Sequence, residues 1–166
     1  NKGIYIIKYQ SSSGDYVEEL KLMPYEFNEA VEMDTYAMSK TSFAVAGKNN
    51  TSARCLLYYT RVLPTNWERK FTKCVDGDIF ATSLAANDNI LAVGYKESKI
   101  ELVDISSNNI VWASNSIIYN PPNLDTGASG LGGFAAELYI EGNLLAVGGP
   151  SLKNDDHTGS HHGRVY

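Results

Sequence analysis

An internal repeat constrains the fold of this chain more than any other feature of its sequence. Three segments align without a gap: Tyr36–Gly47, Leu84–Tyr95 and Leu138–Gly149. Each combines an apolar strand end, a short polar turn and a second strand of the form apolar-Ala-Val-small. The valines of the three second strands, Val45, Val93 and Val147, lie 48 and 54 residues apart. A period of this size is typical of repeat architectures, and we expect units of the same local structure.

A second hairpin follows the first within a unit. Lys99–Ile105 alternates as a half-buried strand does, turns at Ser106–Asn109 and returns as Ile110–Ser114. Its counterpart Gly3–Tyr9 lies 96 residues earlier and precedes a polar turn and the strand Tyr16–Met23. Four antiparallel strands repeated at this interval are typical of a propeller blade. The sequence therefore predicts an all-β fold, a partial β-propeller with four-stranded antiparallel blades of about 50 residues.

The repeat divides the chain into four parts of one incomplete propeller. They are strands C and D of one blade (1–28), two complete blades (29–77 and 78–131) and the start of a further blade (132–166). Helix formers are frequent in Tyr25–Met38 but keep no 3.6-residue period, so its second half is expected to be a strand. Small residues are expected on the narrow strand near the axis: Ala44, Gly47, Ala92, Gly94, Ala146 and Gly148.

Composition narrows the range of partners. A net charge of −5 with singly scattered Lys and Arg argues against nucleic acid, which requires clustered cations. No apolar run approaches the roughly 20 residues of a transmembrane helix, so no membrane insertion is expected within this segment. Because the chain begins at Asn1 and not at Met, we interpret it as a processed or partial product.

The last unit carries a family resemblance. Gly133-Phe134, Leu145–Pro150 and Gly163–Tyr166 occupy the places of a Phe-Gly-type start, an apolar-Ala-Val-Gly-Ala-Pro turn and a Gly-x-Val-Tyr strand. Residues 132–166 thus resemble the FG-GAP repeats of integrin-α-type propellers, although the Phe-Gly order is reversed. The third unit is also similar to quinoprotein-type blades, with an apolar-Trp ending at Val111-Trp112.

The resemblance implies a Ca²⁺ loop between strands A and B, which this chain does not match. Its corresponding turns are Ser39–Ser42, Asn87–Asn89 and Glu141–Asn143. They are too short and too poor in carboxylates to supply the six to eight oxygens that Ca²⁺ takes. We therefore do not transfer the calcium site to this chain.

The segment Asn154–His162 holds the candidate metal ligands. His157, His161 and Asp155 provide imidazole and carboxylate groups that suit Zn²⁺ or another divalent ion. The alternative interpretation is a solvated loop between strands B and C, which we favour because no regular element fixes the spacing of these ligands. The sequence predicts no cofactor.

Catalytic patterns are missing from the sequence. It contains no Gly-x-Ser-x-Gly and no phosphate-binding loop. Glu18 and Glu19 are unsuited to glycoside hydrolysis because neighbouring residues of a strand point to opposite faces. Six aromatic residues are candidates for ligand stacking or, as we favour, for packing between blades: Tyr5, Tyr9, Tyr58, Tyr59, Trp67 and Trp112.

Two features indicate an oxidising compartment. Asn49 and Asn50 begin overlapping glycosylation sequons in an expected B–C turn, 49–51 and 50–52. If the chain turns at Pro64-Thr65, Cys55 lies opposite Cys74, which predicts a disulfide and an extracellular location. The same register places Arg61 opposite Glu68 and Val62 opposite Trp67.

The sequence favours an extracellular or cell-surface, non-enzymatic interaction or structural module. Its expected partner is a protein or a glycan, and the missing strands are expected from further blades of the same polypeptide or from neighbouring subunits, as in a surface filament. The alternative is a fragment of a propeller enzyme, of a quinoprotein-like or glycan-acting kind, with its active site in blades not present. Fold alone does not decide between these two classes.

Overall fold

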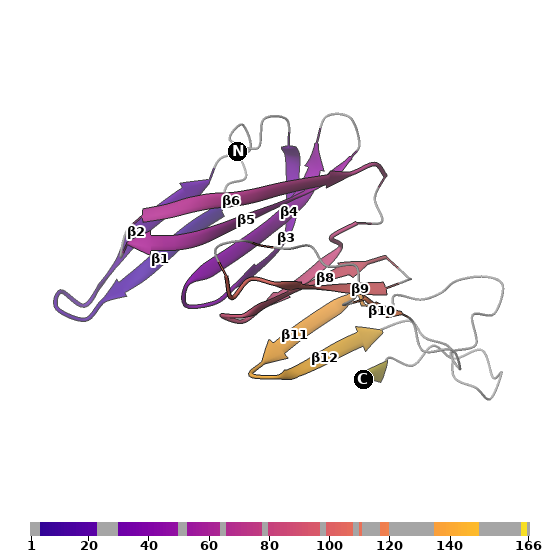
Figure 1. The fold of residues 1–166 in the computed structure, drawn as a ribbon. Helices are drawn as coiled ribbons and strands as arrows, with labels where there is room; N and C mark the ends of the chain where they lie inside the picture. The colour runs from indigo at the N-terminus through magenta and orange to yellow at the C-terminus, as the bar shows by residue number, and fades with distance from the viewer. Residues whose placement is uncertain are drawn as a thin grey trace.

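The computed structural model describes residues 4–22, 30–49, 53–63, 66–77, 80–96, 99–107, 110, 117–119, 135–149 and 164–165. Within these ranges the chain forms β-strands and no helix, which confirms the all-β prediction. The strands make four antiparallel sheets that follow one another along the chain (Figure 1).

The first two sheets come from the N-terminal half. The first sheet is the hairpin β1 (Ile4–Gln10) and β2 (Asp15–Leu22). The second sheet has four strands in chain order: β3 (Ala30–Met38), β4 (Ser42–Asn49), β5 (Arg54–Leu63) and β6 (Asn66–Val75). β3 lies in the second half of the segment that is rich in helix formers, and its strand conformation is as expected.

The third and fourth sheets repeat this order. The third sheet consists of β7 (Ser83–Ala86), β8 (Ile90–Tyr95), β9 (Lys99–Asp104) and β10 (Ile117–Tyr119). The fourth sheet consists of β11 (Glu137–Glu141), β12 (Leu144–Gly149) and β13 (Arg164–Val165). The strand paired with β9 in this third sheet is β10, while most of the expected return strand 110–114 lies outside the described residues.

Consecutive sheets pack face to face, because the two sets of alternating side chains on each strand point to opposite neighbours. In the second sheet, Phe43 and Val45 belong to a cluster with Ile6 of the first sheet. Ala44 and Ala46, which alternate with them, belong to a second cluster with residues of the third sheet. A third cluster joins the third and fourth sheets.

Small residues on β8 allow the fourth sheet to approach closely. A Cβ atom added at Gly94 would lie 2.0 Å from Ser83 Oγ and 2.9 Å from the carbonyl oxygen of Ala135. Ser83 is buried and its hydroxyl donates a hydrogen bond to that same carbonyl. Gly94 is therefore required by the contact between two sheets and not by a turn.

The first strands of the second, third and fourth sheets converge. Residues of β3, β7 and β11 together line a cavity of about 420 Å³: Tyr36–Met38, Leu84–Ala86 and Leu138–Ile140. The small residues expected nearest a propeller axis lie on β4, β8 and β12, the second strand of each of these sheets. Their small size serves the packing of one sheet on the next.

The turns at the ends of these strands are also linked from one sheet to the next. The hydroxyl of Thr41 donates to Asp88 Oδ1 at 3.2 Å, and Asn87 Nδ2 donates to the carbonyl of Gly142 at 2.6 Å. Over the described residues the four sheets lie one after another in chain order, and they do not close into a ring.

Candidate functional site

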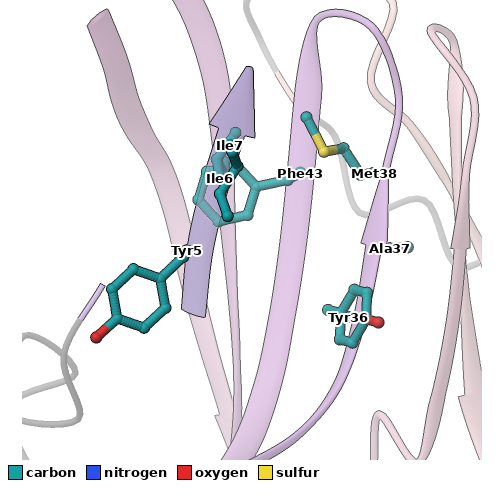
Figure 2. Close-up of a pocket in the computed structure, with 7 residues that line it drawn as sticks. All are labelled: Tyr5, Ile6, Ile7, Tyr36, Ala37, Met38 and Phe43. Atoms are coloured by element: carbon teal, nitrogen blue, oxygen red, sulfur yellow. The ribbon is translucent and has the colours of Figure 1, made fainter. Parts of the chain in front are cut away.

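An apolar groove lies where the first sheet meets the second. Its volume is about 500 Å³. Figure 2 shows the residues that line it, from β1, β3 and β4: Tyr5, Ile6, Ile7, Tyr36, Ala37, Met38 and Phe43. Ile6 and Phe43 form the buried base, whereas Tyr36 is 73% exposed and Ile7 is 58% exposed. Large apolar side chains thus remain accessible to water in one place.

The backbone beside this groove is also unpaired within the part of the chain that the structure describes. Among the described strands, β1 pairs with β2 and has no neighbour on its other side. An edge strand of this kind presents a row of N–H and C=O groups that another strand can pair with. The groove therefore combines accessible apolar side chains with a backbone edge, the two features that β-strand addition uses.

Aromatic packing holds the base of the groove. Phe43 stacks on Tyr59 with ring centroids 4.6 Å apart, and the edge of Trp67 meets Phe43 at 5.1 Å. Arg61 lies over the Trp67 ring and forms an ion pair with Glu19 of the first sheet. Trp67 Nε1 is buried and has no hydrogen-bond partner among the described residues. This network fixes the first sheet against the second.

The predicted aromatic residues fall into two groups. Tyr58 and Tyr59 are buried and Trp67 is half-buried, so these three pack between strands and sheets as expected. Tyr5 and Tyr9 are 46% and 54% exposed, and Tyr5 lines the groove. Trp112 lies outside the described residues. Alternation along a strand cannot show which of two faces will be left uncovered, and this was the information missing from the sequence.

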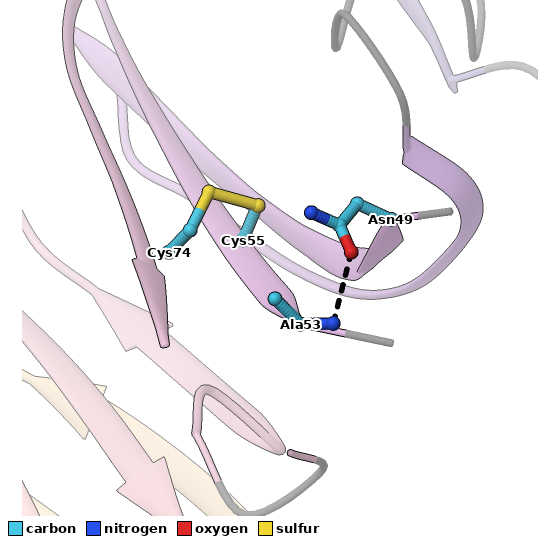
Figure 3. Close-up of a disulfide and its surroundings, with 4 residues drawn as sticks. All are labelled: Asn49, Ala53, Cys55 and Cys74. Carbon is cyan, nitrogen blue, oxygen red and sulfur yellow. Dashed lines mark hydrogen bonds between the residues drawn. A yellow bond between two sulfur atoms is a disulfide. The ribbon is translucent and has the colours of Figure 1, made fainter. Parts of the chain in front are cut away.

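The predicted cysteines form a disulfide. Cys55 and Cys74 lie opposite each other on β5 and β6 with Cα atoms 4.1 Å apart (Figure 3). The other two predicted pairs are wrong, because Arg61 lies opposite Trp67 and Thr60 lies opposite Glu68. Two register shifts, at Tyr58/Tyr59 and at Arg61/Leu63, displace this part of the hairpin by one residue, and the register is restored before the cysteines.

One sequon asparagine closes the turn that precedes β5. The N–H of Ala53 donates to Asn49 Oδ1 at 2.9 Å, as Figure 3 shows, and the N–H of Asn49 donates back to the carbonyl of Ala53 at 2.9 Å. Asn49 is half-buried at the end of β4, whereas Asn50 lies outside the described residues.

No metal centre is seen in the described ranges, where no group of three His, Cys, Asp or Glu side chains is placed to hold an ion. His157, His161 and Asp155 lie outside those ranges. The side chain of Asn87 is hydrogen-bonded to the backbone of its own turn, since Asn87 Oδ1 accepts from the N–H groups of Asn89 and Ile90. This leaves that side chain engaged in a turn and not directed toward a ligand.

A buried carboxylate links the second and third sheets. Glu101, 9% exposed, accepts hydrogen bonds from Tyr95 Oη at 2.9 Å, Lys99 Nζ at 2.9 Å and Lys73 Nζ at 3.3 Å. Burial raises the pKa of Tyr95 above its usual value, and the hydrogen bond to Glu101 and the negative charge of Glu101 raise it further. Two lysines and a tyrosine thus donate hydrogen bonds to the Glu101 carboxylate. We interpret this cluster as structural.

Tyr95 makes the unfolding free energy depend on pH in the alkaline range. Because its pKa is raised in the folded state, the folded protein keeps this proton above pH 10, where the unfolded chain loses it. We expect this group alone to lower the unfolding free energy by about 1.4 kcal/mol per pH unit above pH 10. Tyr95→Phe should make the alkaline slope of urea-unfolding free energies shallower. Equal slopes for the wild type and the variant would contradict this expectation.

Comparison of the chain with protein-family models, with curated proteins and with solved structures finds no match. None of the described segments is a helix long and apolar enough to cross a membrane.

Proposed function

We propose that this chain is part of an extracellular β-propeller that serves as a non-enzymatic interaction module, with the groove between β1 and β3 as its contact surface. The observation that carries the proposal is the exposed apolar lining of that groove, beside an edge of β1 that no other described strand pairs with. Contiguous exposed apolar side chains are typical of surfaces that bind other macromolecules. The propeller assignment is supported by the repeated order of strands and by the convergence of β3, β7 and β11.

The extracellular location is supported by the disulfide. Cys55 and Cys74 are bonded, and the described residues contain no free cysteine. Disulfides persist in oxidising compartments and are rare in the cytosol. The overlapping sequons at Asn49 and Asn50 agree with the same compartment. The resemblance of residues 132–166 to FG-GAP repeats supports an adhesion-type module in place of an enzyme.

The contact surface can be tested by binding of the purified, oxidised chain to cell surfaces, measured by flow cytometry. Tyr36→Ser combined with Met38→Ser removes exposed apolar side chains from the groove without changing its buried base. We expect the apparent affinity to fall about tenfold, the effect of losing roughly 1.4 kcal/mol at an interface. Tyr16→Ser is the control, since Tyr16 is 75% exposed, much as Tyr36 is at 73%, but does not line the groove. Equal binding by the wild type and the groove variant would refute the assignment.

The glycan is expected on Asn50 and not on Asn49, because the Asn49 side chain closes the turn before β5. Ser52→Ala removes the Asn50 sequon and Thr51→Ala removes the Asn49 sequon, and neither alters an asparagine. In a chain secreted from eukaryotic cells, Ser52→Ala should abolish the mass shift produced by removal of N-glycans. Thr51→Ala should preserve that shift. The reverse pattern would assign the glycan to Asn49.

A further inference from the structure

The hairpin of β1 and β2 presents an exposed tyrosine beside its turn. Tyr16 is 75% exposed and is the second residue of β2, directly after the turn at 11–14. Gly14 closes this turn with a φ of 75°, and its N–H donates to the carbonyl of Gln10 at 2.9 Å. In Figure 1 the turn projects away from the other sheets. Within the described ranges the Tyr16 hydroxyl makes no hydrogen bond, so it is accessible as a nucleophile.

The outer strand of a sheet stays exposed even where the preceding sheet is present. Tyr16 lies opposite Tyr9, and one period of 48 residues after Tyr9 the corresponding pair is Leu57 and Thr72. Leu57 is buried in a cluster with Ile6 of the first sheet, whereas Thr72 is exposed on β6. The exposure of Tyr16 is therefore the exposure expected of an outer strand, whether or not another sheet covers β1.

Acidic side chains flank Tyr16 on both sides in the sequence. Asp15 precedes it, and Glu18 follows by two positions, which places Glu18 on the same face of β2 as Tyr16. Asp15 and Glu18 are both exposed. Glu19 differs from them, because its side chain is buried and forms an ion pair with Arg61. Two solvated carboxylates thus lie close to the exposed phenol.

This combination suits a transferase that modifies tyrosine with an anionic donor. The donor of a sulfuryl group is a phosphosulfate, so the transferase that binds it presents a cationic site. An acceptor tyrosine beside exposed carboxylates is attracted to such a site, and charge complementarity of this kind raises the rate of encounter. Two other exposed tyrosines lack this setting, since Lys8 precedes Tyr9 and the hydroxyl of Tyr139 donates to Glu141 at 3.4 Å.

We propose that Tyr16 is an acceptor site for O-sulfation by a transferase of the secretory pathway. The phenol oxygen attacks the sulfur of an adenosine phosphosulfate, and a new O–S bond forms. The S–O bond to the donor's phosphate breaks, the phosphate leaves with the electron pair, and the phenol proton passes to a base of the transferase. The product is a sulfate ester, whose negative charge lies beside Asp15 and Glu18. This inference rests on the extracellular location in the proposed function, because the modification takes place in the pathway in which disulfides form.

Incubation of the purified, oxidised chain with Golgi membranes and a radiolabelled adenosine phosphosulfate tests the site. We expect Tyr16→Phe to lose nearly all of the incorporated sulfate, because the acceptor oxygen is absent. Tyr9→Phe is the control and should keep the label, since Tyr9 is 54% exposed and its ring lies 5.3 Å from that of Tyr16. Circular dichroism checks the folding of each variant. An unlabelled wild type, or equal labelling of the wild type and Tyr16→Phe, would overturn the proposal.

The contribution of the carboxylates is measured as the initial rate of labelling. Glu18→Gln should lower this rate about threefold, because it removes a charge that attracts the transferase. Asp76→Asn changes the net charge equally at an exposed position on the second sheet and should leave the rate unchanged. Equal rates for both variants would overturn the electrostatic recognition of the site.

The labelling assay supplies both donor and transferase, so its result is independent of the groove. If labelling fails while the groove variant loses cell-surface binding, the modification site is refuted and the proposed contact surface stands. If Tyr16 is labelled while the groove variant binds normally, the modification site stands and the contact surface fails.

Discussion

Replacing Arg54 with alanine is expected to lower the unfolding free energy by about 3 kcal/mol, because a buried cation with several hydrogen bonds is lost. The Arg54 side chain is 5% exposed. Its two terminal nitrogens donate to the Asp34 carboxylate at 2.7 and 2.6 Å, and its Nε donates to the carbonyl of Phe80 at 2.7 Å. A further bond of 3.1 Å reaches the carbonyl of Ala81.

These bonds join the second sheet to the segment that enters the third. Ala81 has a φ of 50°, in the left-handed region that is uncommon for residues with a side chain. Arg54 holds this segment where Phe80 is fully buried against Tyr95. Loss of the guanidinium removes the donor from two carbonyls at a buried junction, and water cannot easily replace it there. The cost is therefore expected to exceed that of a surface ion pair.

Asp34→Asn is the matched control. The Asp34 side chain is 42% exposed, so water can solvate the amide that replaces its carboxylate. A loss of less than about 1 kcal/mol in unfolding free energy is therefore expected. Both variants are measured by urea unfolding at pH 7. If Asp34→Asn cost as much as Arg54→Ala, the stabilisation would come from the ion pair and not from the buried carbonyl bonds.

Removing the disulfide is expected to cost about 3 kcal/mol, because the bond restricts the unfolded chain. The two cysteines are separated by 19 positions in the sequence. For a chain of this length, Cys55→Ala combined with Cys74→Ala should lower the melting temperature by about 6 to 12 °C. Scanning calorimetry measures this change directly.

The reducing agent provides the control for the disulfide prediction. Reduction of the wild type should bring its melting temperature close to that of the double variant, and reduction should not affect the variant. Cys55 is 4% exposed in a packed cluster. If the melting temperature of the double variant lies below that of the reduced wild type, the difference reports the lost packing of the Cys55 side chain. Identical melting temperatures for the oxidised wild type and the double variant would contradict the prediction.

The sequence by itself determined the period and the type of the elements. The apolar-Ala-Val-small segments became β4, β8 and β12, because alternating apolar residues bounded by polar turns suit a strand buried between neighbours. It also placed Cys55 opposite Cys74. That pairing was recovered although two intermediate pairs were wrong, since the two register shifts in the hairpin offset each other. Local patterns carry this information because strand alternation and turns involve residues close in sequence.

Tertiary structure alone decided which faces are covered. Tyr36, Leu84 and Leu138 are equivalent in the repeat, yet Tyr36 is 73% exposed whereas Leu84 is 6% exposed, because Leu84 packs against the second sheet. The contacts of Arg54 with Asp34 and Phe80, and of Glu101 with Lys73, join residues 20 to 28 positions apart and follow no sequence motif. Burial and charge pairing depend on the packing of whole sheets, and local residue patterns do not record that packing.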